Sequence, residues 1–166
     1  MALLEILTFP DERLKRVSDP VTVFDEELRA FIRALDETRL HAPGCVGIAA
    51  PQVGRTQRIV IVDLTGKKMS HHGHMVLINP EILSWDGMAA GREGCLSVPD
   101  FTGNVIRAER ITLTACDVGG EERRYEFEGF EARAVQHELD HLDGLLFLDR
   151  LVSRTKDLFR RKVYQK

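Results

Sequence analysis

The chain has 166 residues and a formal net charge of −3. We expect residues 1–166 to form a single domain, since that length suffices for one core. The charge balance gives no basic footprint, so no DNA partner is expected. No apolar run is long enough to span a bilayer, and residues 1–6 lack the basic start of a signal peptide, so no membrane partner is expected. The three cysteines favour a reducing compartment and hence the cytoplasm.

The first predicted element is a helix that begins at Asp25, a residue well suited to cap a helix N-terminus. Pro43 and Gly44 are expected to end it. Between them, apolar residues recur at the spacing of one helix face: Leu28, Phe31, Ile32 and Leu35.

Strands follow in the middle of the chain. The β-branched runs at residues 58–62 and 75–78 predict two strands. Apolar and polar residues alternate from Ile111 to Cys116, which predicts a strand with one wetter face. The pair Gly119-Gly120 then predicts a hairpin turn into a strand at residues 123–127.

A second helix is predicted after Gly129, with Gly144 as its stop signal. One stripe of this helix carries Phe130, Ala134, His137 and His141. A last, C-terminal helix is expected at about residues 153–163. The order of elements predicts an α+β fold in which antiparallel strands pack around a central metal-binding helix.

The metal-binding assignment rests on the motif His137-Glu138-Leu139-Asp140-His141. Residues four apart lie on one helix face, so both imidazoles can reach one cation. In this arrangement the glutamate works as general base on a metal-bound water. The simpler alternative is a chance match on an amphipathic helix. Asp140 either supports the ligands from behind or belongs to the polar face.

A third ligand is needed, because catalytic zinc-type sites use three protein ligands and one open position. No histidine follows His141, and only weak acidic candidates lie downstream: Asp143, Asp149 and Asp157. Cys95 is the stronger candidate, since Gly94 lets the backbone turn tightly beside it and present the thiolate from a loop or strand end.

Three segments together give a specific resemblance. Residues 93–97 (Glu-Gly-Cys-Leu-Ser) resemble the second signature of the peptide deformylases, and residues 136–141 resemble their third. Their first signature is similar to residues 45–52, except that Cys45 stands where glycine is usual. Flanking stretches extend the resemblance over nearly the whole chain: residues 10–14 and 76–80.

The resemblance implies a hydrolase that removes the formyl group from the N-terminal formylmethionine of nascent polypeptides and releases formate. It implies one divalent metal ion held by Cys95, His137 and His141. Fe²⁺ is expected, with Zn²⁺, Ni²⁺ or Co²⁺ as alternatives, because a thiolate–imidazole set suits several of these ions. Metal-bound water would attack the formyl carbon. Glu138 would act as base and then acid.

Two oxyanion donors follow from the same resemblance. They are the Gln52 side-chain amide and the backbone N–H of Leu96. Without the resemblance, Gln52 would be read as an ordinary loop amide.

The resemblance also implies a set of substrate-binding residues. Val46 and Gly47, with Gly94, would hydrogen-bond the extended peptide by β-addition. Phe130 and Ala134 would line the methionine pocket opposite Val46. Taken alone, Val46 and Gly47 are equally well a core residue and a turn residue.

Several residues outside the motifs need separate readings. Thr102 occupies a position where many relatives carry arginine, which would alter how the peptide is held. Arg133, at the edge of the helix stripe, meets either the peptide or solvent. Residues 71–74 (His-His-Gly-His) read as a solvated loop, not a second metal site. The basic residues 160–162 read as a solvated helix face or a contact with ribosomal RNA.

Two alternatives to the deformylase reading remain at this stage. One is a metallopeptidase that cuts internal peptide bonds, which would need a third ligand other than Cys95. The other is a catalytically silent module that binds formylated N-termini. The intact ligand set favours the enzyme. The departures at Cys45 and Thr102 keep the silent module open.

Overall fold

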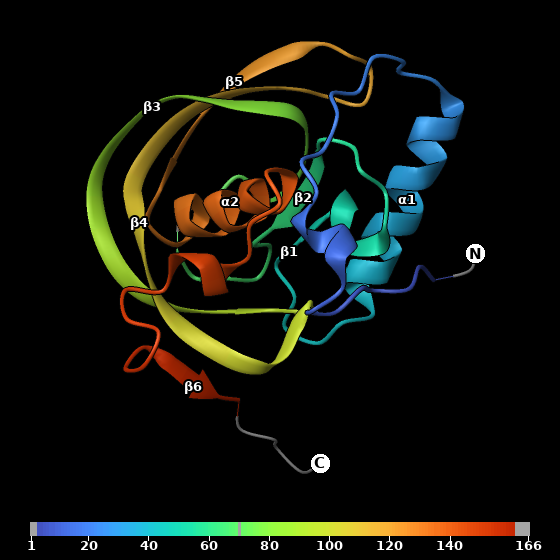
Figure 1. Ribbon diagram of the computed structural model, residues 1–166. Coiled ribbons are helices and arrows are strands. Elements are labelled where there is room, and N and C mark those ends of the chain that lie inside the picture. The colour runs from blue at the N-terminus through green and yellow to red at the C-terminus, as the bar shows by residue number, and fades with distance from the viewer. Residues whose placement is uncertain (1–2, 70, 162–166) are drawn as a thin grey trace.

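Figure 1 shows the computed structural model, which describes residues 3–69 and 71–161. The described residues form two α-helices, six strands and three short 3-10 helices. The α-helices are α1 (Glu26–Leu40) and α2 (Gly129–Leu142). The strands are β1 (Gly47–Ala49), β2 (Ile59–Asp63), β3 (His74–Cys95), β4 (Val98–Cys116), β5 (Glu122–Glu128) and β6 (Leu158–Arg160). The 3-10 helices are η1 (Glu12–Lys15), η2 (Ala50–Val53) and η3 (Phe147–Arg150).

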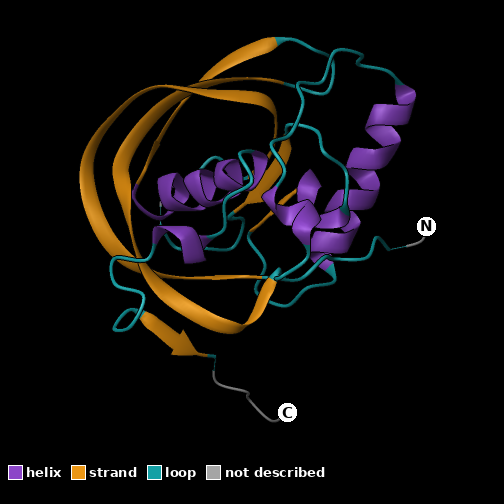
Figure 2. Ribbon diagram, in the orientation of Figure 1, coloured by secondary structure: helices purple, strands orange, loops and turns teal. Residues whose placement is uncertain are grey.

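The strands form one antiparallel sheet in the order β1-β2-β3-β4-β5, and β6 pairs with β4 outside that order. β3 and β4 are 22 and 19 residues long. They curve as a long ribbon around α2, which lies inside the curve (Figures 1 and 2). The α+β fold with antiparallel strands around a central helix is therefore confirmed.

The pattern of apolar residues did not predict the full length of this ribbon. Within this ribbon, strands were expected only at residues 75–78 and 111–116, whereas β3 extends to Cys95 and β4 begins at Val98. Most side chains of β3 from Glu81 to Arg92 are exposed on both faces. The apolar–polar alternation that identifies a half-buried strand is therefore missing from this segment.

β1 and β2 separate two hydrophobic clusters. Ile48, Ile59 and Ile61 pack with residues of α1, whereas Val60 and Val62 pack with residues of α2. All five side chains are fully buried. Burying a side chain of this size contributes about 1.5–3 kcal/mol. The two faces of this short sheet thus fix both helices, and α2 in particular, against the strands that lead into the site.

Local signals placed the α-helix ends well. The Asp25 carboxylate accepts a hydrogen bond from the Leu28 N–H at 2.9 Å, as expected of an N-cap. α1 ends at Leu40, slightly before the predicted stop at Pro43. Gly144 follows α2 with a φ of +75°, and a Cβ there would lie 2.4 Å from the Lys15 carbonyl oxygen. Glycine is therefore required at this turn for two reasons, conformation and space.

The predicted C-terminal helix is wrong for the described residues. Between residues 153 and 161 the chain forms turns and strand β6, which pairs with Phe101–Gly103 of β4. Residues 162 and 163 lie outside the described residues. Leu158 and Phe159 are half-buried. The unpaired edge of β4 supplies backbone partners that helical periodicity could not anticipate. Neither helix in the described part of the chain is long and apolar enough to cross a membrane.

Candidate active site

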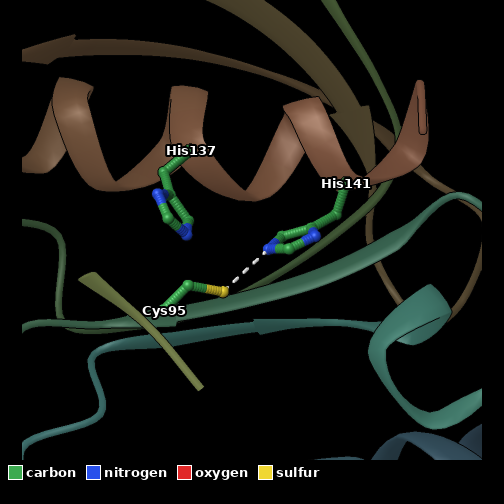
Figure 3. A group of neighbouring side chains, drawn as sticks. All are labelled: Cys95, His137 and His141. Carbon is green, nitrogen blue, oxygen red and sulfur yellow. Dashed lines mark hydrogen bonds between the residues drawn. The ribbon is translucent and has the colours of Figure 1, made fainter. Parts of the chain in front are cut away.

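Cys95, His137 and His141 lie together, with both histidines on α2 (Figure 3). One candidate ligand atom from each residue lies within 4.8 Å of the others. The Cys95 Sγ is 3.3 Å from the His141 Nε2. Both imidazoles project from α2 towards the cysteine, as one helical turn of separation requires.

Local structure explains how Cys95 reaches the two histidines. Cys95 is the last residue of β3 and pairs with Val98, the first residue of β4, so that only Leu96 and Ser97 form the turn. Cys95 lies at a strand end, as expected, and the pairing register shifts between Gly94 and Cys95. Gly94 pairs with Thr102 inside the ribbon and does not have a positive φ.

The His137 ring is held in one orientation by Glu93. The Glu93 carboxylate accepts a hydrogen bond from His137 Nδ1 at 2.8 Å, which leaves Nε2 for the metal side. Glu93 also accepts from Arg107 at 2.9 and 2.8 Å and from Arg133 at 2.7 Å. Burial alone would raise the pKa of Glu93, but these donors outweigh it and hold the pKa well below its usual range.

Glu138 lies beside the ligand group with little freedom. Its carboxylate Oε2 would lie 2.7 Å from a Cβ on Gly47, so only glycine at position 47 leaves room for it. Burial raises the pKa of Glu138 to about 7, against the opposing charge of His137. This value suits a group that must both accept and release a proton near neutral pH.

Two buried atoms at this site have no hydrogen-bond partner among the described residues. They are Glu138 Oε1 and His141 Nδ1. Buried polar atoms are normally paired, so Glu138 Oε1 marks a position that a bound species can complete, whereas His141 Nδ1 is not the nitrogen that faces Cys95. A thiolate, two imidazoles and an adjacent free carboxylate oxygen fit a divalent cation with one open position.

Gln52 is fixed in position by three contacts. Its Oε1 accepts from the Ala49 N–H at 2.9 Å, and its Nε2 donates to Ser97 Oγ at 3.1 Å and lies 3.5 Å from Cys95 Sγ. The side chain is buried. It is thus a preorganised donor beside the metal group, not an ordinary loop amide.

A cavity of about 1040 Å³ opens onto the ligand group. It brings the residues predicted from the sequence together, with the buried His141 as the one that does not line it. The lining includes Val46, Gly47, Gln52, Gly94, Cys95, Leu96, Phe130, Ala134, His137 and Glu138.

The contacts of Arg133 and Asp140 bear on two further predictions from the sequence. Arg133 lines the cavity, and its guanidinium donates to Glu93 and to the carbonyl oxygens of Ala89 and Val105. Asp140 is not merely part of a polar face, since it is buried and accepts from Arg107 and Arg150.

The structure also shows where the remaining cysteines and two further histidines lie. Cys45 lines the cavity and does not adopt a left-handed backbone conformation, so its replacement of glycine introduces no strain. Cys45 and Cys116 are half-buried free thiols. His72 contacts Glu131 and His74 contacts Asp36. The only group of potential metal ligands found in the described chain is Cys95, His137 and His141.

Several residues that shape the site were not predicted from the sequence to lie there. Arg107 links Glu93 to Asp140, and so joins β3 to α2 through β4. A lone arginine within a stretch without strand periodicity carries no signal for this contact. Lys67, Arg92 and Arg161 also line the cavity, from segments far apart in the chain.

Together these groups define a site for metal-dependent hydrolysis. A Cys-His-His set can bind the cation, a buried carboxylate with a pKa of about 7 stands beside it, and a fixed amide donor faces the same cavity. The metallopeptidase alternative required a ligand other than Cys95, whereas Cys95 lies with both histidines.

Comparison with known proteins gives the family. The polypeptide deformylase family matches residues 3–157. A peptide deformylase of Alkalilimnicola ehrlichii is 47% identical over 163 residues, covering 98% of this chain and 90% of that protein. The crystal structure of a Legionella pneumophila peptide deformylase superimposes with a TM-score of 0.84 at 42% identity, covering 93% of this chain and 90% of that one. A class I type b peptide deformylase from Acinetobacter baumannii, crystallised with Met-Ala-Ser bound, gives a TM-score of 0.85 at 37% identity, covering 90% of this chain and 99% of that one.

The chain belongs to the polypeptide deformylase family. It is an enzyme that removes the formyl group from the N-terminus of newly made polypeptides, and the activity expected from the three sequence motifs is confirmed. This outcome sets aside both the metallopeptidase and the silent binding module.

Proposed function

We propose that Cys95, His137 and His141 hold one divalent metal ion and that the surrounding residues carry out the deformylation steps. The observation that carries this assignment is the convergence of the three ligand atoms within 4.8 Å. When bound, such an ion supplies Lewis acidity and lowers the pKa of a coordinated water molecule. The family resemblance makes Fe²⁺ the proposed native ion, and the mixed thiolate–imidazole set equally suits Zn²⁺, Ni²⁺ or Co²⁺.

Glu138 moves the proton in this proposal. Its free Oε1 accepts a proton from the attacking water and later delivers it to the departing amine. The pKa of about 7 leaves both forms of the carboxyl accessible at neutral pH. Gly47 leaves the space that this carboxylate occupies, because the side chain of any larger residue would displace it.

Gln52 and Leu96 stabilise the negative charge that develops on the formyl oxygen. The Gln52 amide is held by Ala49 and Ser97, so little reorganisation is needed when the charge appears. The Leu96 backbone N–H lies in the tight turn directly after Cys95. Removing one such donor typically costs about 2.7–4 kcal/mol of activation free energy.

The substrate enters as an extended peptide in this scheme. Val46, Gly47 and Gly94 offer backbone groups along the cavity, and Phe130 and Ala134 line the side that receives the methionine side chain. The Acinetobacter baumannii relative crystallised with Met-Ala-Ser supports an N-terminal methionine peptide as the product.

The residue roles can be tested by formate release from formyl-Met-Ala-Ser, with metal content measured on the same preparation. Glu138→Gln keeps the size of the side chain but removes the base. It should retain one metal per chain and lose at least about 100-fold in turnover, the lower end of general acid–base contributions. Glu122→Gln, an exposed glutamate of β5, is the matched control. Turnover within a few-fold of wild type in Glu138→Gln would remove its assigned role.

We also propose that the enzyme acts in the cytoplasm close to the ribosome, where nascent chains emerge. The bacterial relatives support this setting. Arg160 is exposed on β6 and provides positive charge for ribosomal RNA. Arg160→Glu should reduce co-sedimentation with ribosomes, and because Arg160 also lines the cavity, its activity on a tripeptide is measured separately. Undiminished co-sedimentation would argue against this contact.

A further inference from the structure

The C-terminal strand forms one wall of the substrate cavity. Leu158–Arg160 pairs with Phe101–Gly103 of β4, and the Arg161 N–H donates to the Asp100 carbonyl at 2.8 Å, which extends the pairing by one residue. The Arg92 guanidinium stacks on the Phe159 ring at 3.7 Å and anchors the strand from the other side. Residues 158–161 and Arg92 all line the cavity.

The Arg161 side chain lies against Gly94 of β3 at this wall of the cavity. Its Nη2 lies 2.5 Å from the position that a Cβ on Gly94 would occupy, so the guanidinium rests directly against the Gly94 backbone. Gly94 precedes the metal-ligand candidate Cys95. Glycine at position 94 therefore makes room for Arg161.

Within the described part of the protein, the positive charge of Arg161 is not paired with an acidic side chain. No carboxylate among the described residues lies within 4.0 Å of its guanidinium, whereas Arg107, Arg133 and Arg150 all have acidic partners. The residue is exposed to the cavity. A guanidinium presents five N–H donors in a planar array, so an unpaired one at a peptide-binding wall offers hydrogen bonds to acceptors on the ligand.

We propose that Arg161 binds backbone carbonyl oxygens of the substrate peptide on the C-terminal side of the formylmethionine. This inference rests on the proposed function, in which the extended substrate peptide lies along Gly94. Thr102, which pairs with Gly94 across the ribbon, has a short side chain whose methyl group contacts the same position. The residue that follows β6 thereby supplies, beside Gly94, a cation that Thr102 does not.

The test compares Arg161→Ala with Arg154→Ala in the metal-loaded, full-length protein. Arg154 is an exposed arginine of the same C-terminal segment that does not line the cavity. Three substrates are used: formyl-Met-Ala-Ser, its C-terminal amide, and formylmethionine amide, which lacks the downstream peptide units. Binding of the product Met-Ala-Ser is measured separately by calorimetry. The thermal midpoint of each variant reports whether β6 stays in place.

Arg161→Ala should raise KM for both tripeptides about tenfold, the loss expected for one hydrogen bond to a charged group. It should leave kcat, and turnover of formylmethionine amide, unchanged. Product binding should weaken by a similar factor, Arg161→Lys should recover part of the loss, and Arg154→Ala should match wild type.

Three other results have defined meanings. If Arg161→Ala matches Arg154→Ala on every substrate, the proposal is overturned. If only the free-acid tripeptide is affected, Arg161 recognises a terminal carboxylate and the carbonyl assignment is overturned. If wild type releases no formate while Arg161→Ala still weakens Met-Ala-Ser binding about tenfold, the proposed function fails but the Arg161 assignment stands.

Discussion

Replacing Arg107 by methionine should cost the protein much of its stability, because this guanidinium joins two buried carboxylates. The Arg107 side chain is 3% exposed and pairs with Glu93 and Asp140, whose side chains are 5% and 9% exposed. Methionine preserves an apolar side chain of similar length. It would leave two negative charges facing each other in the interior without the cation between them.

The size of the loss follows from burial. Breaking a buried ion pair by removing one partner costs about 3–5 kcal/mol, because a charge is left uncompensated. Arg133 still contacts Glu93 and Arg150 still contacts Asp140. We therefore expect the lower end of the range, about 3 kcal/mol in the free energy of unfolding.

The matched control is Arg110→Met. Arg110 lies on the same strand, β4, and pairs with Asp86, but the two side chains are 52% and 74% exposed. Exposed pairs contribute about 0–1 kcal/mol, so this variant should unfold almost like wild type. The comparison isolates burial, since residue type, substitution and strand are the same.

Urea unfolding of the metal-free proteins measures both changes. The double variant Glu93→Gln/Arg107→Met should lose less than the sum of its single variants, because removing the carboxylate charge relieves the burial of an unpaired group. The reasoning is refuted if Arg107→Met and Arg110→Met differ by less than about 0.5 kcal/mol, the usual error of additive comparisons.

Three further predictions concern the same region. Cys95→Ala should lose the bound metal while Cys116→Ala keeps it, and elemental analysis that finds equal metal in both would remove Cys95 from the ligand set. Because the folded-state pKa of Glu93 is held low, its ionised form stabilises the fold above the unfolded pKa of about 4.3, and that contribution declines as pH falls. Urea midpoints of the metal-free protein between pH 5 and pH 3 should therefore fall more steeply for wild type than for Glu93→Gln, and parallel curves would contradict this. Burial, with the nearby Glu138 charge, raises the pKa of Cys45 to about 11, so only about one thiol in three thousand is ionised at pH 7.5. Alkylation of Cys45 by iodoacetamide, followed by mass spectrometry, should be slow there and about tenfold faster for each pH unit up to about 10; a fast, pH-independent reaction would disagree.

Residues whose roles depend on local geometry were predicted well from the sequence. The spacing of His137 and His141 fixes both imidazoles on one face of α2, because the helix repeats every 3.6 residues. Asp25 caps α1 and Gly144 closes the turn after α2 for reasons confined to a few neighbouring residues. Apart from His141, the predicted site residues all line one cavity.

Contacts between distant segments were decided only by the tertiary structure. Cys95 reaches the histidines because β3 and β4 curve around α2, although β3 shows no alternation in burial from Glu81 to Arg92. Arg107 meets Glu93 and Asp140 across three elements. The C-terminal residues form a strand because the edge of β4 offers free backbone partners, which places Arg161 against Gly94. Hydrophobic periodicity and capping residues are signals that depend on neighbours within the same segment. The pairing of edges and buried charges depends on which segments meet, and that is set by how the whole sheet closes around the helix.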